Sequence, residues 1–242
     1  MVRSVGINIL FISLLLIGCT ITDNSQTTGH DTLQAIEEQS KVEKKDLMIQ
    51  SEETRKNNIN AVDYLLPLEN SKPRLETITH VMVHFISNAA RKPEDPYNPD
   101  DVYSIFEEYG VSAHYMIGRD GTVFQLVSED RVAYHAGAGE LQDYPDYTNR
   151  LNEFSIGIEL LAIGTREEMF PAIPVRVYNV IDPTMIGYTD EQYEALNALL
   201  NDIFERNPSI VRDRNHVIGH DEYAPGRKAD PGSLFEWSKL GL

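Results

Sequence analysis

The sequence has little cysteine and a shortage of positive charge, and each shortage excludes a class of protein. Cys19 is the only cysteine among the 242 residues, so the chain forms no internal disulfide. Lysine and arginine together number 21 against 38 aspartates and glutamates, which gives a formal net charge of -17 at pH 7. Because this excess of negative charge repels phosphate backbones, it argues against nucleic acid as a partner.

Long apolar runs are also lacking, and the apolar run nearest the N-terminus covers only residues 7–17, after the positive charge of Arg3. A run of about eleven residues is too short to span a bilayer but has the length of the apolar core of a secretory signal. It ends in Leu16-Ile17-Gly18-Cys19, which resembles the bacterial lipobox, where cleavage precedes the cysteine and its sulfur receives a lipid.

We therefore predict a lipoprotein signal peptide over residues 1–18 and lipidation of Cys19. The acyl chains would hold the protein on a membrane of the cell envelope, facing the cell wall outside the cytoplasm. The alternative is a plain signal peptide followed by an incidental cysteine.

Tryptophan, tyrosine and phenylalanine are absent from residues 20–58, which are polar and charged. Such a segment cannot bury enough apolar surface to fold alone, so we predict a flexible tether over residues 19–58. Apolar and aromatic residues recur from about residue 62 onward, and we expect one folded, monomeric domain over residues 59–242.

The folded region alternates strand and helix patterns, which indicates an α/β domain. Strands are predicted over residues 78–86, 114–117, 122–127 and 154–162, the second and third joined at Asp120-Gly121 as a hairpin. Helices are predicted from Asn98 to Gly110 and from Thr189 to Phe204, the latter opened by a capping box. Residues 164–187 are expected to form an inserted loop or hairpin.

Three side chains could form a metal site. His220 and Asp230 lie ten residues apart on a loop rich in proline and glycine, and His84 lies near the end of an apolar strand. Two histidines and a carboxylate suit zinc with a fourth position open for water. His80 cannot share this site with His84, since four strand residues separate them by about 13 Å. Alternatively, His84 is structural and Asp230 belongs to a surface ion pair with Lys228 or Arg227.

The sequence resembles a known family over about residues 64–237. The matching blocks are Val81-Met82-Val83-His84, Val111-Ser112-Ala113-His114-Tyr115, Arg119-Asp120-Gly121, Ala133-Tyr134-His135-Ala136-Gly137, Phe154-Ser155-Ile156-Gly157-Ile158-Glu159 and Gly219-His220 through Gly232. In this order they are similar to the type 2 zinc N-acetylmuramoyl-L-alanine amidases, which are related to peptidoglycan recognition proteins. The resemblance implies a central mixed β-sheet flanked by helices.

The resemblance also implies roles for individual residues. The zinc ligands would be His84, His220 and Asp230, and the catalytic pair would be Glu159 and Lys228. His135 and Arg227 would face the substrate, although a hydrogen-bonded loop histidine and a structural arginine are the alternatives. Some family members carry a tyrosine where this chain has Ala113, so the chain resembles the branch that uses the glutamate.

The implied reaction is hydrolysis of the amide between N-acetylmuramic acid and L-alanine in peptidoglycan or its muropeptide fragments. Zinc polarises the carbonyl and lowers the pKa of water from 15.7 to about 7. Glu159 would transfer a proton from that water to the departing nitrogen, and Lys228 would stabilise the developing oxyanion. The alternative is a module that binds muropeptides without cutting them. Such relatives commonly lose a metal ligand, whereas this chain keeps all three.

Overall fold

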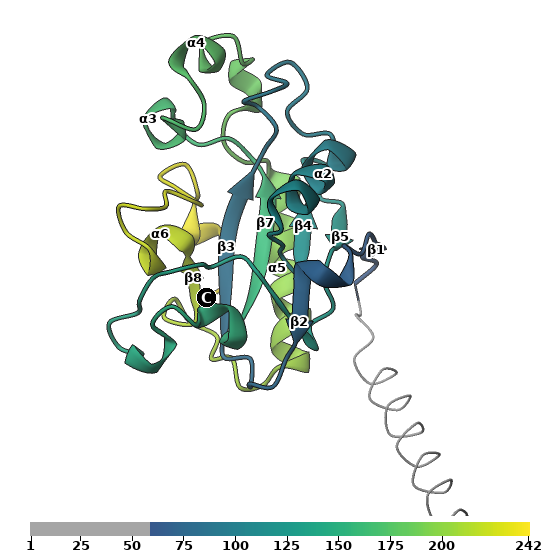
Figure 1. The fold of residues 1–242 in the computed structure, drawn as a ribbon, viewed down its shortest axis with the longest axis vertical. Helices are drawn as coiled ribbons and strands as arrows, with labels where there is room; N and C mark the ends of the chain where they lie inside the picture. The colour runs from purple at the N-terminus through teal and green to yellow at the C-terminus, as the bar shows by residue number, and fades with distance from the viewer. Residues whose placement is uncertain (1–58) are drawn as a thin grey trace, which may run out of the picture. The chain divides into compact units, whose positions relative to one another are not determined.

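The computed structural model describes residues 59–242, which form a mixed α/β fold around a central sheet (Figure 1). Within this part of the chain the sheet has six strands, in the order β1 (Val62–Asp63), β5 (Val123–Gln125), β4 (Tyr115–Ile117), β7 (Ser155–Leu161), β3 (His80–Ile86) and β8 (Val217–Gly219). β4 and β5 pair antiparallel and the other neighbours pair parallel. The expected mixed sheet and the β4–β5 hairpin are therefore confirmed. The predicted signal peptide, Cys19 and the tether lie outside the described residues.

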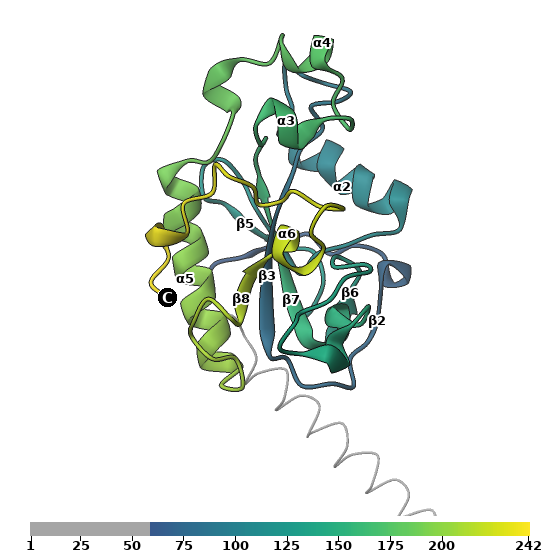
Figure 2. The ribbon, with the colours of Figure 1, turned by 90° about the vertical axis from the view of Figure 1, so that its left-hand side faces the viewer.

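One face of the sheet packs against α5 (Asp190–Arg206), as Figure 2 shows. Because successive strand residues point to opposite faces, Val81 and Val83 of β3 and Ile158 of β7 share this side. They join a buried cluster with apolar residues of α5, including Leu196. The predicted capping box opens the helix, since the Thr189 hydroxyl accepts from the Gln192 backbone and the Gln192 side chain accepts from the Thr189 backbone.

The opposite face is covered by α2 (Pro99–Tyr109) and by the antiparallel pair of β2 (Ser71–Pro73) and β6 (Arg131–Ala133) (Figure 2). Asn98 caps α2 by accepting hydrogen bonds from two backbone amides, and Gly110 ends the helix with φ 62°. That left-handed conformation favours glycine, as the sequence predicts. None of the helices within residues 59–242 combines the length and the apolar character needed to cross a membrane.

Residues 164–187 form a loop with short helical turns and not a hairpin. α3 (Arg166–Met169) and α4 (Val175–Tyr178) lie at the top of Figure 1, and Val175 and Val177, whose alternation suggested a strand, belong to the helical turn that follows Pro174. Met169, Ile173 and Ile181 of the segment pack with Ala89 and Ile163 in a small apolar core. Helical side-chain packing on that core explains why the hairpin alternative is wrong.

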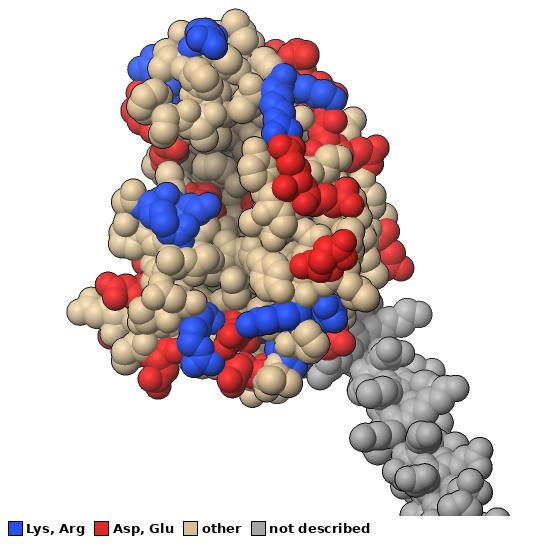
Figure 3. Space-filling view, in the orientation of Figure 1, with Lys and Arg blue, Asp and Glu red and all other residues tan. Residues whose placement is uncertain are grey.

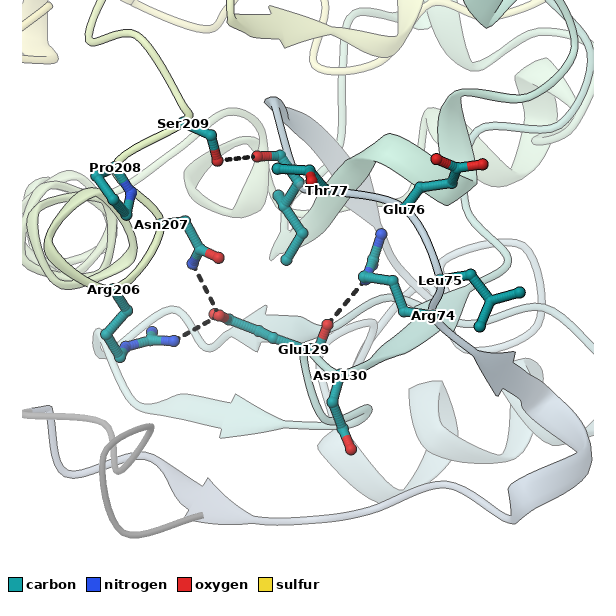
Figure 4. Close-up of a pocket in the computed structure, with 11 residues that line it drawn as sticks. Arg74, Leu75, Glu76, Thr77, Glu129, Asp130, Arg206, Asn207, Pro208 and Ser209 are labelled. Carbon is teal, nitrogen blue, oxygen red and sulfur yellow. Dashed lines mark hydrogen bonds and ion pairs between the residues drawn. The ribbon is translucent and has the colours of Figure 1, made fainter. Parts of the chain in front are cut away.

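A cleft of about 360 Å³ lies near the start of β3, beside the end of α5 (Figure 4). Three of its charged groups, those of Arg74, Glu129 and Arg206, already have protein partners. Glu129 bonds to Arg206 and Asn207 and accepts from the Tyr115 hydroxyl, while Arg74 donates to the Glu129 carbonyl. The polar lining of this cleft therefore stabilises the fold by joining the end of α5 to the sheet.

Replacing Arg206 with leucine should destabilise the protein by about 3 to 5 kcal/mol, because it removes a cation from a buried pair and leaves the Glu129 charge in a site that excludes water. The two side chains each expose only 9% of their surface. Urea unfolding would measure the loss. Arg176→Leu, at an exposed position, should change stability by less than about 0.5 kcal/mol. Equal effects from both substitutions would contradict a structural role for the Arg206 pair.

Candidate metal centre and active site

Strand register brings the candidate residues to one place on the sheet. His84 of β3 is the direct neighbour of Glu159 of β7 in the parallel ladder, and both face away from α5. β8 pairs with the other side of β3 and ends at Gly219, the neighbour of Val83. His220 follows at once as the first residue of α6 (His220–Tyr223). The site therefore lies at the carboxyl ends of three parallel strands.

His84, His220 and Asp230 converge, with one ligand atom from each lying within 4.8 Å of the others. The Nδ1 atoms of His84 and His220 lie 2.8 and 3.0 Å from Oδ2 of Asp230. Asp230 lies on the loop after α6, and its carbonyl accepts from the Asp221 amide at 2.8 Å. These are the three residues that the sequence singles out as metal ligands.

His80 lies elsewhere, as its spacing from His84 predicts. Its Nδ1 is 2.9 Å from the Thr79 hydroxyl, and its ring packs edge-on against Tyr144 and Tyr147. Burial lowers the pKa of His80 to about 4, so this ring is neutral at physiological pH. His80 therefore belongs to an aromatic cluster outside the three-residue site.

The donor chemistry of the three residues fits a zinc ion. Nε2 of His220 lies 2.8 Å from the carbonyl oxygen of Ala136. A carbonyl only accepts, so Nε2 carries the proton and Nδ1 offers its lone pair to the site. Metal-binding histidines typically donate the N–H of the ring nitrogen that does not face the metal to a carbonyl in this way.

The pKa values around the site also suit a cation. Burial lowers the pKa of His84 to about 4 despite the neighbouring Asp230, which leaves the ring neutral, as a ligand must be. The cluster thus places the neutral ring of His84 beside the carboxylate of Asp230.

The pKa of Glu159 is shifted upward, in contrast to that of His84. Burial, together with the charge of Asp230, raises the pKa of Glu159 to about 8, while the charge of Lys228 acts to lower it. Its Oε2 atom is buried and has no hydrogen-bond partner within the described residues. A carboxylate with a pKa near the working pH and a free oxygen is suited to accept and return a proton.

Lys228, Arg227 and His135 border the site in different ways. Lys228 is exposed on the loop after α6, where basic side chains gather at the rim of a hollow below the lobe of α3 and α4 (Figure 3). Arg227 donates to the carbonyls of Ala136 and Ala138. Both ring nitrogens of His135 have protein neighbours. Burial, and to a smaller extent the nearby His84, lowers the pKa of His135 well below the usual value.

Two further residues shape the site, and their sequence signal is weak. The Asn152 side chain accepts from the backbone amides of His135 and Ala136, at 3.0 and 2.7 Å. The Ser155 hydroxyl lies 3.2 Å from Nε2 of His135. Serine and asparagine are common at turns and strand ends, and a backbone carbonyl such as that of Ala136 has no residue signature at all.

Comparison with known proteins identifies the family. The sequence profile of the family described as N-acetylmuramoyl-L-alanine amidase matches residues 74–233. The chain belongs to the type 2 N-acetylmuramoyl-L-alanine amidase family. This family is one of hydrolases, and the resemblance stated from the sequence blocks is confirmed.

Two relatives of this amidase family carry the same name, 1,6-anhydro-N-acetylmuramyl-L-alanine amidase AmpD. The Escherichia coli K12 protein is 32% identical over 186 residues, which cover 72% of this chain and 86% of that protein. The Citrobacter freundii protein is 38% identical over 130 residues, and the match spans 54% of this chain and 55% of that protein. A crystal structure of an AmpD derivative superposes with a TM-score of 0.56 at 30% identity, covering 74% of this chain and 92% of the other.

Glu159→Gln should stabilise the metal-free protein in a pH-dependent way. Below the ordinary pKa of 4.5 the carboxyl is protonated in both folded and unfolded chains. Between pH 4.5 and 8 only the unfolded chain ionises, so the wild type loses stability as pH rises and the glutamine variant does not. The gap should grow to about 3 to 5 kcal/mol near pH 8.

Urea unfolding with a chelator at several pH values would measure this gap. Glu194→Gln, at an exposed position on α5, is the matched control and should show none. A gap for Glu159→Gln that stays constant from pH 5 to pH 8 would disprove the raised pKa.

Proposed function

We propose that this protein is a zinc-dependent amidase that hydrolyses the bond between N-acetylmuramic acid and L-alanine in muropeptides derived from peptidoglycan. One observation carries the proposal: two histidine nitrogens and a carboxylate oxygen converge beside a buried glutamate whose pKa is raised to about 8. The names of the relatives direct attention to 1,6-anhydro muropeptides as the first substrates to test.

The residues around the three ligands would divide the work of amide hydrolysis. A zinc ion held by His84, His220 and Asp230 would polarise the scissile carbonyl and make water more acidic. Glu159 accepts the proton of the attacking water at its free oxygen and returns it to the departing nitrogen. Lys228, exposed on the loop after α6, supplies positive charge to the oxygen that becomes negative.

Purified protein should contain about one zinc per chain and release free stem peptide from an anhydro-muropeptide, which mass spectrometry would detect. Glu159→Gln should keep the zinc but lower kcat by about 10² to 10⁴, because proton transfer is lost while the ligands stay. Glu194→Gln should behave as wild type. Tight muropeptide binding with no released peptide would instead identify a binding module.

The proposal extends to where the protein acts, on the basis of the lipobox-like Leu16-Ile17-Gly18-Cys19. Lipidated Cys19 would hold the catalytic domain on a membrane of the cell envelope, within reach of the wall and its fragments.

Cys19→Ala should abolish incorporation of labelled fatty acid and leave the signal peptide uncleaved, since the sulfur is the acceptor of the lipid. Metabolic labelling and the mass of the purified chain would show both effects. Ser25→Ala, a few residues further along, should be labelled and cleaved as the wild type is. An unlabelled wild-type protein recovered from the cytoplasm would rule out this placement.

A further inference from the structure

A chain of hydrogen bonds leads from a backbone carbonyl to His84, and its direction can be assigned step by step. The Leu151 carbonyl only accepts, so the Ser155 hydroxyl, at 2.6 Å, donates to it. The remaining lone pairs of Ser155 then accept from Nε2 of His135, at 3.2 Å. His135 therefore carries its proton on Nε2 and presents an unprotonated Nδ1.

The next bond fixes His84 in the same way. Nε2 of His84 lies 3.0 Å from Nδ1 of His135. Because that Nδ1 has no proton, His84 must donate, and its own proton sits on Nε2. The lone pair of His84 is then on Nδ1, the atom that lies 2.8 Å from Asp230.

The ring of His135 is held in place from two sides. Its backbone amide and that of Ala136 both donate to the Asn152 side chain. On the other side lies Gly157 of β7, where an added Cβ atom would stand 2.5 Å from Cγ of His135. This is closer than real Cβ contacts, so the absence of a side chain at Gly157 makes room for the histidine.

We propose that His135 is a positioning residue that holds His84 in the tautomer whose Nδ1 faces His220 and Asp230. It acts through His84 and has no need to touch the substrate, since both of its ring nitrogens are engaged. The neighbouring Ala136 carbonyl does the same for His220. Two adjacent residues, 135 and 136, thus orient both histidines of the site. The inference rests on metal binding in the proposed function.

Competition with a chromophoric chelator would measure zinc affinity, and long-range ¹H–¹⁵N spectra of the metal-free protein would report which nitrogen of His84 is protonated. His135→Leu should weaken zinc binding about 10- to 100-fold, the usual effect of removing the outer partner of a ligand. The spectra should show His84 changing from one tautomer to a mixture. Ser155→Ala should act in the same direction, because it frees His135 to reverse its own tautomer.

Gly157→Ala is a third variant that removes no polar atom and should weaken zinc binding by displacing the His135 ring. Gly241→Ala, where an added Cβ meets nothing within 4 Å, is the matched control and should leave zinc affinity unchanged. Circular dichroism and urea unfolding would show which variants are folded. If His135→Leu or Gly157→Ala fails to fold, the zinc affinity and the His84 tautomer of Ser155→Ala still test the proposal.

Three results would overturn the inference. Unchanged zinc affinity and an unchanged His84 tautomer in folded His135→Leu would exclude positioning. A raised KM with normal zinc affinity would identify a substrate contact. A complete loss of zinc equal to that of His84→Ala would make His135 a ligand. A wild-type protein that binds no zinc would refute the proposed function, which is a separate outcome.

Discussion

The parallel hydrogen bonding of β3 between β7 and β8 is the constraint on which the rest of the structure depends. This ladder places His84 beside Glu159 and brings His220 out of the sheet next to both. Side chains alternate along a strand, so a slip of one residue in β3 would turn His84 into the apolar layer under α5 and bring Val83 to the site. The apolar residues on the α5 side therefore fix the register of β3 and with it the position of His84, because a slip would bury polar groups under α5 and remove valines from that layer.

Burial gives the site its electrostatic character, and it acts differently on each group. The same exclusion of water keeps His84 neutral and raises the pKa of Glu159. Asp230 and Glu159 also repel each other, which adds to the basicity of Glu159. A divalent cation among the three ligand atoms would offset the charge of Asp230 and ease the ionisation of Glu159. The bare arrangement is thus costly, and a cation relieves that cost.

Much of this architecture could be predicted from the sequence, because its signals are local. Capping residues marked the start of both long helices, Gly110 marked an end, and the apolar strands carried His84 and Glu159 at recognisable positions. Family resemblance supplied the ligand set, which spacing alone left open. The orienting contacts could not be predicted, since Ser155 and the Ala136 carbonyl act by placement in space and not by residue type. The short helices of residues 164–187 were missed because three prolines and alternating valines obscure their period.

Asp230 and the second histidine lie on a segment that contributes little to the layer between the sheet and α5. Within the described residues, the large apolar cluster on that side has no member from residues 220–232. Substitution of His220 or Asp230 can therefore remove a candidate metal ligand without touching that cluster. The three residues that converge on the candidate metal site and the residues that hold the sheet to α5 are thus different sets, so loss of the ligands and loss of that apolar layer are separate events in this scaffold.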